Sequence, residues 1–225
     1  PKGGPKLGGR GFDVLVDSGA GDEAGYPDEA YIEAGAKIAK TDAEAVAGAD
    51  VVFTVRRPAL SVAKAMKKGA ALVGMVDPFS DAAGLDALAK TGVALFAMEL
   101  MPRITRAQSM DVLSSQSNLA GYKAVVDASA AFERALPMMM TAAGTVPAAR
   151  VFVMGVGVAG LQAIATARRL GAIVTATDVR PAVKEQVASL GAKFIAVEDE
   201  EFKQAETAGG YAKEMSAGYK KKQAE

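Results

Sequence analysis

The stretch that decides the fold is Arg150-Val-Phe-Val-Met-Gly155-Val-Gly157-Val-Ala-Gly160, which continues to Thr177-Asp178. The apolar run 151–154 predicts a buried parallel strand, residues 161–170 predict a helix, and the β-rich run 173–177 predicts a second strand. Glycines between a strand and a helix permit a tight turn and a close approach of the backbone to a ligand. The stretch is therefore typical of a βαβ unit that binds a dinucleotide.

Each glycine of this fingerprint has an expected task. Gly155 permits the tight turn, Gly157 lets the backbone approach a pyrophosphate, and Gly160 lets the helix pack closely on the strand. The phosphates are expected to lie against free N–H groups and the positive end of the helix dipole. Asp178 follows Gly155 by 23 residues. That is about the spacing of a carboxylate that binds both ribose hydroxyls of NAD.

The composition excludes several classes of function. The 26 basic and 26 acidic residues cancel, so charge gives no indication of a nucleic acid or an anionic lipid as partner. The chain has no cysteine and no histidine, which removes disulfides, thiolate ligands, the commonest general acid–base and the commonest metal ligand. No apolar run approaches the roughly 18–20 residues of a membrane span. We predict no metal site and no direct membrane span.

Strands and helices alternate along the chain, which predicts an open, mostly parallel α/β sheet. Residues 1–11 are rich in Gly, Pro and Lys and are expected to form a flexible or atypical leader. Residues 12–118 are expected to form a first α/β domain. Residues 119–147 are expected to hold a linker helix, capped by Asn118 and ended by Pro137, and its connection onward. The predicted class is α/β, with two Rossmann-like open parallel-sheet domains joined by a long helix.

The second domain, residues 148–225, is expected to hold only the N-terminal half of an NAD-binding Rossmann domain. Three strands are predicted in it, the last at 193–197, whereas two βαβαβ halves need about six. We therefore expect this domain to be truncated. The charged stretch after residue 197 is expected to be solvated surface, although Gly209-Gly210-Tyr211 could instead belong to a mobile lid.

A polar stretch at 99–117 follows an apolar strand predicted at 93–98. Open parallel sheets bind ligands at the carboxyl ends of their strands. A glutamine there could match a carboxamide, and an aspartate could hold the forked cation of an arginine. The candidate ring-positioning residues are Arg103, Gln108, Asp111 and Ser114. Composition alone favours an ordinary polar loop that caps the next helix.

The absence of histidine bears on the reaction. Two nicotinamides can exchange a hydride without proton transfer, so such a site needs positioning and electrostatics rather than a general base. A dehydrogenase that acts on an alcohol or an amine must also move a proton. The composition therefore modestly favours hydride exchange between nucleotides.

Three long stretches resemble a known family: RITRAQSMDVLSSQSNLAGYKAVVD, MMMTAAGTVPAARVFVMGVGVAGLQAIATARRLGAIVTATDVR and ETAGGYAKEM. Together they resemble the NAD(H)-binding component, domain I of the alpha subunit, of proton-translocating nicotinamide nucleotide transhydrogenase. The likeness is close from about Glu99 onward and looser over residues 12–98. Residues 1–11 do not match the opening strand of the family.

The resemblance implies an oxidoreductase that passes a hydride between NAD(H) on this chain and NADP(H) on a partner component. In the family, the loop that matches Arg103, Gln108, Asp111 and Ser114 lies against the nicotinamide, so these become the expected catalytic residues. A mobile loop near 199–215 is expected to fold over the nucleotide. The expected cofactor-binding residues are Gly155, Val156, Gly157, Val158, Gly160, Asp178, Val179, Arg180 and Tyr211.

The resemblance also implies partners and a location. It implies coupling to proton translocation through a membrane-spanning component, a separate NADP(H)-binding component and a homodimer. The implied location is cytoplasmic and peripheral at the inner membrane, or the matrix face in mitochondria. We expect the chain to be a fragment of such a subunit.

Two alternatives stay open. Alanine dehydrogenase resembles the family in both domains, but its substrate site uses a histidine and a lysine. The corresponding stretches here, VVFTVRRP and ALVGMVDPF, contain no histidine and offer arginines where the lysine is expected. The other alternative is a non-catalytic NAD-binding or dimerisation fragment.

Overall fold

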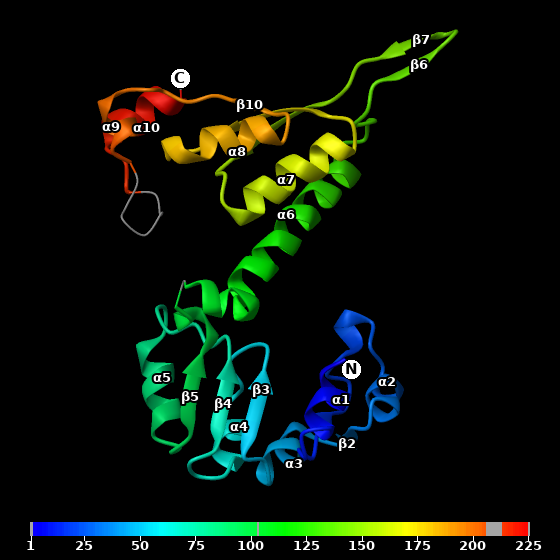
Figure 1. Cartoon of the computed structure of the whole chain (residues 1–225), viewed down its shortest axis with the longest axis vertical. Coiled ribbons are helices and arrows are strands. Elements are labelled where there is room, and N and C mark those ends of the chain that lie inside the picture. The colour runs from blue at the N-terminus through cyan, green and yellow to red at the C-terminus, as the bar shows by residue number, and fades with distance from the viewer. Residues whose placement is uncertain (1, 103, 206–212, 225) are drawn as a thin grey trace. The chain divides into compact units, whose positions relative to one another are not determined.

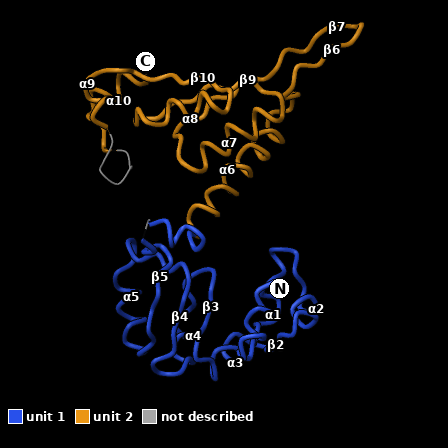
Figure 2. The backbone as a smooth tube through the Cα atoms, in the orientation of Figure 1, with its two compact units in different colours: residues 1–111 blue, residues 112–225 orange. Residues whose placement is uncertain are grey.

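The computed structural model describes residues 2–102, 104–205 and 213–224. The chain separates into two compact units, residues 1–111 and residues 112–225, which are coloured differently in Figure 2. Each unit contains parallel strands that are connected by helices. The predicted α/β fold with parallel, Rossmann-like sheets is therefore confirmed.

The first unit is built on two parallel sheets. Strands β1 (Leu15–Asp17) and β2 (Lys37–Ala39) pair with each other. The second sheet lies side by side in the order β3 (Val51–Thr54), β4 (Ala71–Gly74) and β5 (Ala94–Ala97) (Figure 1). The connecting helices are η1 (Asp22–Ala24), α2 (Asp28–Glu33), α3 (Asp42–Ala47), α4 (Leu60–Ala65) and α5 (Ala82–Ala89).

Two helices of this unit begin at side chains that satisfy their free N–H groups. Thr41 precedes α3 and accepts a hydrogen bond from the Glu44 N–H at 3.2 Å. Asp81 precedes α5 and accepts one from the Gly84 N–H at 2.9 Å. Both are preferred residue types at a helix start, which explains why α3 and α5 begin at these positions.

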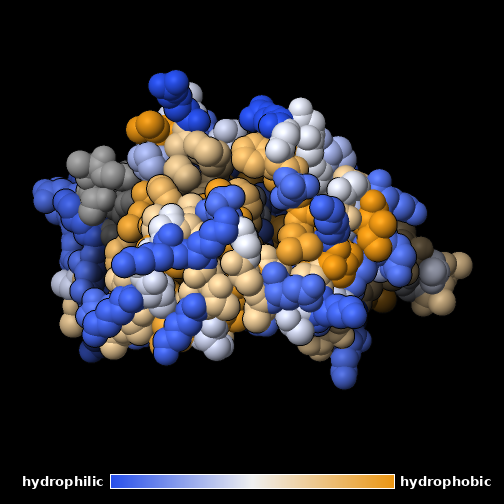
Figure 3. Space-filling model, turned by 90° about the horizontal axis from the view of Figure 1, so that it is seen from below, coloured by the Kyte–Doolittle hydropathy of each residue, from blue (hydrophilic) through white to orange (hydrophobic). Residues whose placement is uncertain are grey.

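The sheet β3-β4-β5 buries one face more deeply than the other. Leu72 is fully buried and packs with the partly buried Val52 and Leu95. The alternating residues Phe53 and Phe96 stay 68% and 57% exposed, as side-chain alternation along a strand requires. The face of the molecule drawn in Figure 3 likewise shows apolar groups exposed among charged ones.

Residues Gly3–Gly8 form helix α1, where a flexible or atypical leader was predicted. None of its residues is buried, and its glycine and proline content gives it a weak helix propensity. A Cβ added to Gly4 would lie 3.1 Å from the carbonyl oxygen of Ala34. The glycine thus lets α1 closely approach the residue that follows α2.

The second unit contains the predicted βαβαβ arrangement. Its parallel sheet has the order β10 (Lys193–Phe194), β9 (Ile173–Thr177) and β8 (Arg150–Met154). Helices α7 (Val158–Arg169), η4 (Pro181–Val183) and α8 (Lys184–Ser189) connect these strands. The core of buried residues is Val125, Val156, Ile164, Ala167, Ala172, Val174, Ala176, Val183 and Val187. The third strand is shorter than the predicted 193–197.

The long helix α6 (Val112–Ala131) differs from its predicted bounds. It begins six residues before Asn118, which was expected to cap it. Asn118 instead lies inside α6 and donates its side-chain amide to Gln162 Oε1 of α7 at 3.1 Å. Asp111 directly precedes α6 and is an equally good capping type, so the sequence offered two starts. The helix ends at Ala131, before Pro137.

An antiparallel hairpin follows α6 and was not predicted. It consists of β6 (Met139–Thr141) and β7 (Gly144–Val146), and all six of its residues are exposed. Its methionines, Met139 and Met140, are 53% and 70% exposed. In isolation a two-stranded hairpin is marginally stable.

None of the described residues of the charge runs 198–201 and 220–222 is buried, as expected for surface, but apolar residues near them are buried. Helices α9 (Glu200–Lys203) and α10 (Ala217–Ala224) are present. A small core joins the buried residues Phe202, Ala205, Met215 and Tyr219. Phe202 and Ala205 lie in or just after α9, and Met215 and Tyr219 lie before and in α10. Each pair has helical spacing, but α9 is only four residues long and the sequence does not show that the two pairs pack together. Tyr211 and the rest of 206–212 lie outside the described residues.

Candidate functional site

The fingerprint turn joins β8 to α7. Gly155 has a φ of +90°, a conformation that glycine adopts far more readily than other residues. Its N–H donates to the carbonyl oxygen of Thr177 at 2.8 Å, which ties the turn to the end of β9. Gly157 then precedes the first residue of α7 with no side-chain cap.

The glycines of the turn differ in the space around them. A Cβ added to Gly160 would collide with the carbonyl oxygen of Gly155, so the close contact between α7 and the turn requires glycine there. A Cβ added to Gly155 or Gly157 would meet no atom within 4 Å. The inner side of the turn is therefore filled, and its outer side is open to an approaching group.

The start of α7 offers donors to that open side. The first four N–H groups of an α-helix have no partner within the helix, and Gly157, the residue before α7, has no side chain to cap them. The aligned peptide dipoles place partial positive charge at the same end. This arrangement can bind a phosphate or pyrophosphate with backbone groups alone.

Asp178 lies at the end of β9 and is only 7% exposed. Its Oδ2 accepts a hydrogen bond from the Val156 N–H at 2.7 Å, and its Oδ1 accepts one from the Arg180 N–H at 2.8 Å. Burial by itself would raise the pKa of Asp178, but the hydrogen bonds from Arg180 and Val156 hold it below its ordinary value. The group is an ionised acceptor that touches the glycine turn.

The Arg180 guanidinium completes this site. It donates from Nε to Asp178 Oδ1 at 2.9 Å and from Nη2 to Asp178 Oδ2 at 2.9 Å. Nη2 also lies 3.1 Å from the carbonyl oxygen of Val156. The structure therefore brings together the predicted residues Val156, Asp178 and Arg180 around one carboxylate.

The predicted nicotinamide-facing residues lie elsewhere along the chain. Gln108 is exposed within the 3₁₀ helix η3 (Thr105–Met110), and Asp111 follows this helix. Ser114 lies in the first turn of α6 rather than in a loop, because the helix begins at Val112. Arg103, like Tyr211, lies outside the described residues.

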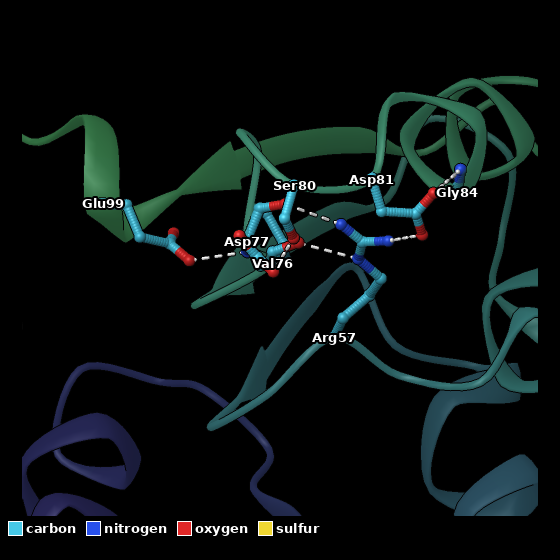
Figure 4. A network of polar contacts seen from close by, with 7 residues as sticks. All are labelled: Arg57, Val76, Asp77, Ser80, Asp81, Gly84 and Glu99. Atoms are coloured by element: carbon cyan, nitrogen blue, oxygen red, sulfur yellow. Dashed lines mark hydrogen bonds and ion pairs between the residues drawn. The ribbon is translucent and has the colours of Figure 1, made fainter.

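A polar network at the carboxyl ends of β3, β4 and β5 was not predicted (Figure 4). Arg57 donates from Nε to the Val76 carbonyl oxygen at 2.7 Å and from Nη2 to the Asp77 carbonyl oxygen at 2.8 Å. It also donates from Nη1 to Asp81 Oδ2 at 2.5 Å. Hydrogen bonds from the Gly84 N–H and from Arg57 lower the pKa of Asp81.

The same network continues to Glu99, which follows β5. Asp77 has a φ of +51°, an uncommon conformation for a residue that is not glycine. Its N–H donates to Glu99 Oε1 at 2.7 Å. Glu99 Oε2 is buried and has no hydrogen-bond partner among the described residues. No motif indicates this network, because two of the acceptors of Arg57 are the backbone oxygens of Val76 and Asp77 and the carboxylate of Asp81 lies 24 residues further along the chain.

The described ranges hold neither a membrane-spanning helix nor a metal cluster. Within residues 2–102, 104–205 and 213–224, no helix combines the length and hydropathy needed to cross a membrane. In those ranges no cluster of Asp and Glu side chains could hold a metal ion either.

Both halves of the chain match family models. Residues 1–120 match "Alanine dehydrogenase/PNT, N-terminal domain", and residues 124–218 match "Alanine dehydrogenase/PNT, C-terminal domain". The chain belongs to the alanine dehydrogenase/PNT family. The first match includes residues 1–11, so the segment that we expected to lie outside the resemblance falls within the family's N-terminal domain.

Relatives within the alanine dehydrogenase/PNT family separate into two groups. The first part of NAD(P) transhydrogenase subunit alpha from Rhodospirillum rubrum is 60% identical over 225 residues, which cover 98% of this chain and 59% of the relative. The crystal structure of transhydrogenase from Sinorhizobium meliloti is 61% identical with a TM-score of 0.83, and the match covers 87% of this chain and 58% of that one. Alanine dehydrogenase of Halomonas elongata is 30% identical over 182 residues, which cover 79% of this chain and 48% of the relative.

The predicted resemblance to transhydrogenase alpha subunits is confirmed by these identities, and the alanine dehydrogenase is the more distant relative. The chain spans about 59% of the length of the curated transhydrogenase relative.

Proposed function

We propose that this chain is a portion of the NAD(H)-binding subunit of a transhydrogenase, an oxidoreductase that transfers a hydride between NAD(H) and NADP(H). The observation that carries the proposal is the hydrogen bond between Asp178 and the glycine turn. It couples an ionised acceptor for a ribose to an open turn that suits a pyrophosphate. The 60% identity to a transhydrogenase alpha subunit supports the same reaction.

The cofactor is assigned to the second unit. The N–H groups at the start of α7, together with Gly155, Gly157 and Gly160, are proposed to hold the pyrophosphate. The backbones of Val156 and Val158 form the rest of that turn. Asp178 is proposed to accept hydrogen bonds from the adenosine ribose, with Val179 and Arg180 beside it and Tyr211 over the nucleotide.

The nicotinamide is assigned to the segment that holds Arg103, Gln108, Asp111 and Ser114. These residues are proposed to orient the ring and its carboxamide. A hydride passes directly from one nicotinamide to another, so no side chain has to take up a proton. The NADP(H) is proposed to be bound by a partner component.

The assembly follows from the same proposal. A membrane-spanning component would couple the hydride transfer to proton translocation, and two copies of this subunit would form a dimer. The subunit would then lie peripherally at the inner membrane. The boundaries of a first domain at 12–118, a linker at 119–147 and a cofactor domain from 148 also belong to this proposal.

The experiment mixes the protein with its NADP(H)-binding partner, NADH and an NADP⁺ analogue whose reduced form absorbs at its own wavelength. Reduction of the analogue that depends on NADH and on both proteins is the expected result. No reduction, together with turnover of alanine or of pyruvate and ammonia, would show that the alanine dehydrogenase alternative is correct.

A further inference from the structure

Both oxygens of the Asp178 carboxylate are occupied by protein donors. Val156 N–H and Arg180 N–H take one lone pair on each oxygen, at 2.7 and 2.8 Å. Nε and Nη2 of Arg180 take another on each, both at 2.9 Å. An ionised carboxylate offers about four lone-pair sites. These four donors therefore saturate the residue that is assigned to the ribose.

The two kinds of donor differ in how easily they can leave. The N–H groups belong to the backbone of the glycine turn and of the residue after β9, so they stay in place as long as the fold does. The guanidinium is on a long side chain that is 18% exposed. Rotation of that side chain toward solvent would vacate one position on each carboxylate oxygen.

The two donors Nε and Nη2 of Arg180, called the fork below, have the same hydrogen-bonding pattern as the diol of a ribose. Nε and Nη2 present two parallel donors to two carboxylate oxygens, which is the bidentate geometry of arginine–carboxylate pairs. The 2′- and 3′-hydroxyls of an adenosine ribose also present two neighbouring donors to the same two oxygens. The fork and the diol therefore require the same two positions.

We propose that Arg180 competes with the adenosine ribose for Asp178 and thereby sets the nucleotide selectivity of this site. The proposal rests on the proposed function, because it takes Asp178 as the ribose acceptor. Binding of NAD(H) then requires the guanidinium to leave the carboxylate, which lowers the affinity. The displaced cation lies beside the 2′ position, where it attracts a 2′-phosphate and weakens the discrimination against NADP(H).

Competition and direct contact predict opposite changes in ligand affinity when Arg180 is removed. If Arg180 mainly bound the nucleotide, its removal would weaken the binding of every adenosine diphosphate ligand. If Arg180 competes with the ribose, its removal strengthens the binding of a ligand with a free diol and weakens that of the 2′-phosphorylated ligand. The two probes need no nicotinamide and no partner protein.

The experiment measures the affinity for ADP-ribose and for 2′-phospho-ADP-ribose by titration calorimetry at about pH 8. Arg180→Met keeps an unbranched side chain without donors, and Arg180→Lys keeps the charge without the fork. Lys184→Met is the matched control, because Lys184 is an exposed cation nearby that pairs with Glu198. Circular dichroism confirms that each variant is folded.

Arg180→Met is expected to bind ADP-ribose about tenfold more tightly, the effect of about one charge-assisted hydrogen bond. Its binding of 2′-phospho-ADP-ribose should weaken, Arg180→Lys should lie between it and the unmodified protein, and Lys184→Met should change neither. Unchanged or weaker ADP-ribose binding by the folded arginine variants overturns the proposal. If Arg180→Met does not fold, the direction of the change in Arg180→Lys decides.

The inference and the proposed function fail in different ways. An unmodified protein that does not bind ADP-ribose overturns both. An unmodified protein that binds ADP-ribose and transfers hydride, with arginine variants that bind no more tightly, overturns only the competition.

Discussion

The carboxylate of Asp178 accepts a hydrogen bond from the backbone N–H of Val156 at 2.7 Å, so the end of β9 is tied to the glycine turn that follows β8. Asp178→Asn removes the charge and places an amide N–H₂ against existing donors. We expect a loss of about 3 kcal/mol in the free energy of unfolding, as for other broken buried ion pairs. The preference for NADH over NADPH should also fall, because a carboxylate repels a 2′-phosphate.

Urea unfolding and nucleotide titration measure both effects. Asp127→Asn is the matched control, because Asp127 pairs with Lys123 on the surface and is 60% exposed. Surface pairs contribute about 0–1 kcal/mol. Equal losses in the two variants would contradict a special role for Asp178.

The pH dependence of stability provides a separate test of the same carboxylate. The pKa of Asp178 is lower in the folded protein than its ordinary value of 3.8. The stability that the ionised Asp178 contributes is therefore fully present above the ordinary pKa, and it is lost as the pH falls through the lower pKa of the folded protein. Between about pH 5 and pH 2 the unmodified protein should lose more stability than Asp178→Asn. Parallel curves of unfolding free energy against pH would refute this contribution.

Two glycines of the fingerprint should separate stability from binding. Gly160→Ala forces a Cβ against the carbonyl oxygen of Gly155 and should cost about 2 kcal/mol or more. Gly157→Ala meets no atom within 4 Å and should cost less than about 1 kcal/mol as the residue before the helix. It should still weaken NADH binding at least tenfold, because the added Cβ lies where a pyrophosphate must approach. Thermal melts and NADH titrations of both variants check this, and an unchanged affinity in Gly157→Ala would count against the phosphate assignment.

Gln108 should affect the reaction without affecting the fold. It is exposed in η3, so Gln108→Leu should change the free energy of unfolding by less than about 0.5 kcal/mol. The hydride-transfer rate at saturating nucleotide should fall at least about tenfold, with little change in the NADH dissociation constant. Gln116→Leu, at an exposed position in α6, is the control. A normal rate in Gln108→Leu would remove this residue from the proposed site.

The small core near the C-terminal end of the chain should be measurable through one hydroxyl. Tyr219 is 1% exposed, and its hydroxyl donates to the carbonyl oxygen of Val197 at 3.0 Å. Tyr219→Phe leaves that oxygen without its donor and should cost about 1 kcal/mol. Tyr122→Phe, at a 51% exposed position, should cost nothing measurable. Equal melting temperatures of the two variants would contradict the burial of Tyr219.

Local patterns in the sequence predicted most of the fold. The alternation of apolar strands with a helical stretch placed β8, α7 and β9, and the glycine spacing identified the turn between β8 and α7. Prediction was weaker where two local choices were equivalent, as for Asp111 and Asn118 at the start of α6. Each is a good capping type, but in the structure Asn118 lies inside α6 and bonds Gln162 of α7.

The features that could not be predicted depend on contacts that the local sequence pattern does not show. Phe202 and Tyr219 share a core although they are 17 residues apart, and local spacing does not show that they meet. The fork of Arg180 on Asp178 joins residues only two apart, but the sequence does not say whether the guanidinium turns toward the carboxylate or toward a ligand. Arg57 donates to two backbone oxygens, which carry no residue-type information, and to a carboxylate 24 residues away.

Direct transfer of the reducing hydrogen is the measurement that tests the proposed reaction most directly. The protein and its NADP(H)-binding partner are mixed with NADH that carries deuterium at the transferred position of the nicotinamide and with an NADP⁺ analogue. Mass spectrometry then follows the label. We predict that deuterium appears in the reduced analogue without exchange with solvent. Failure to reduce the analogue, or reduction with hydrogen from water, would contradict direct hydride transfer between the two nucleotides.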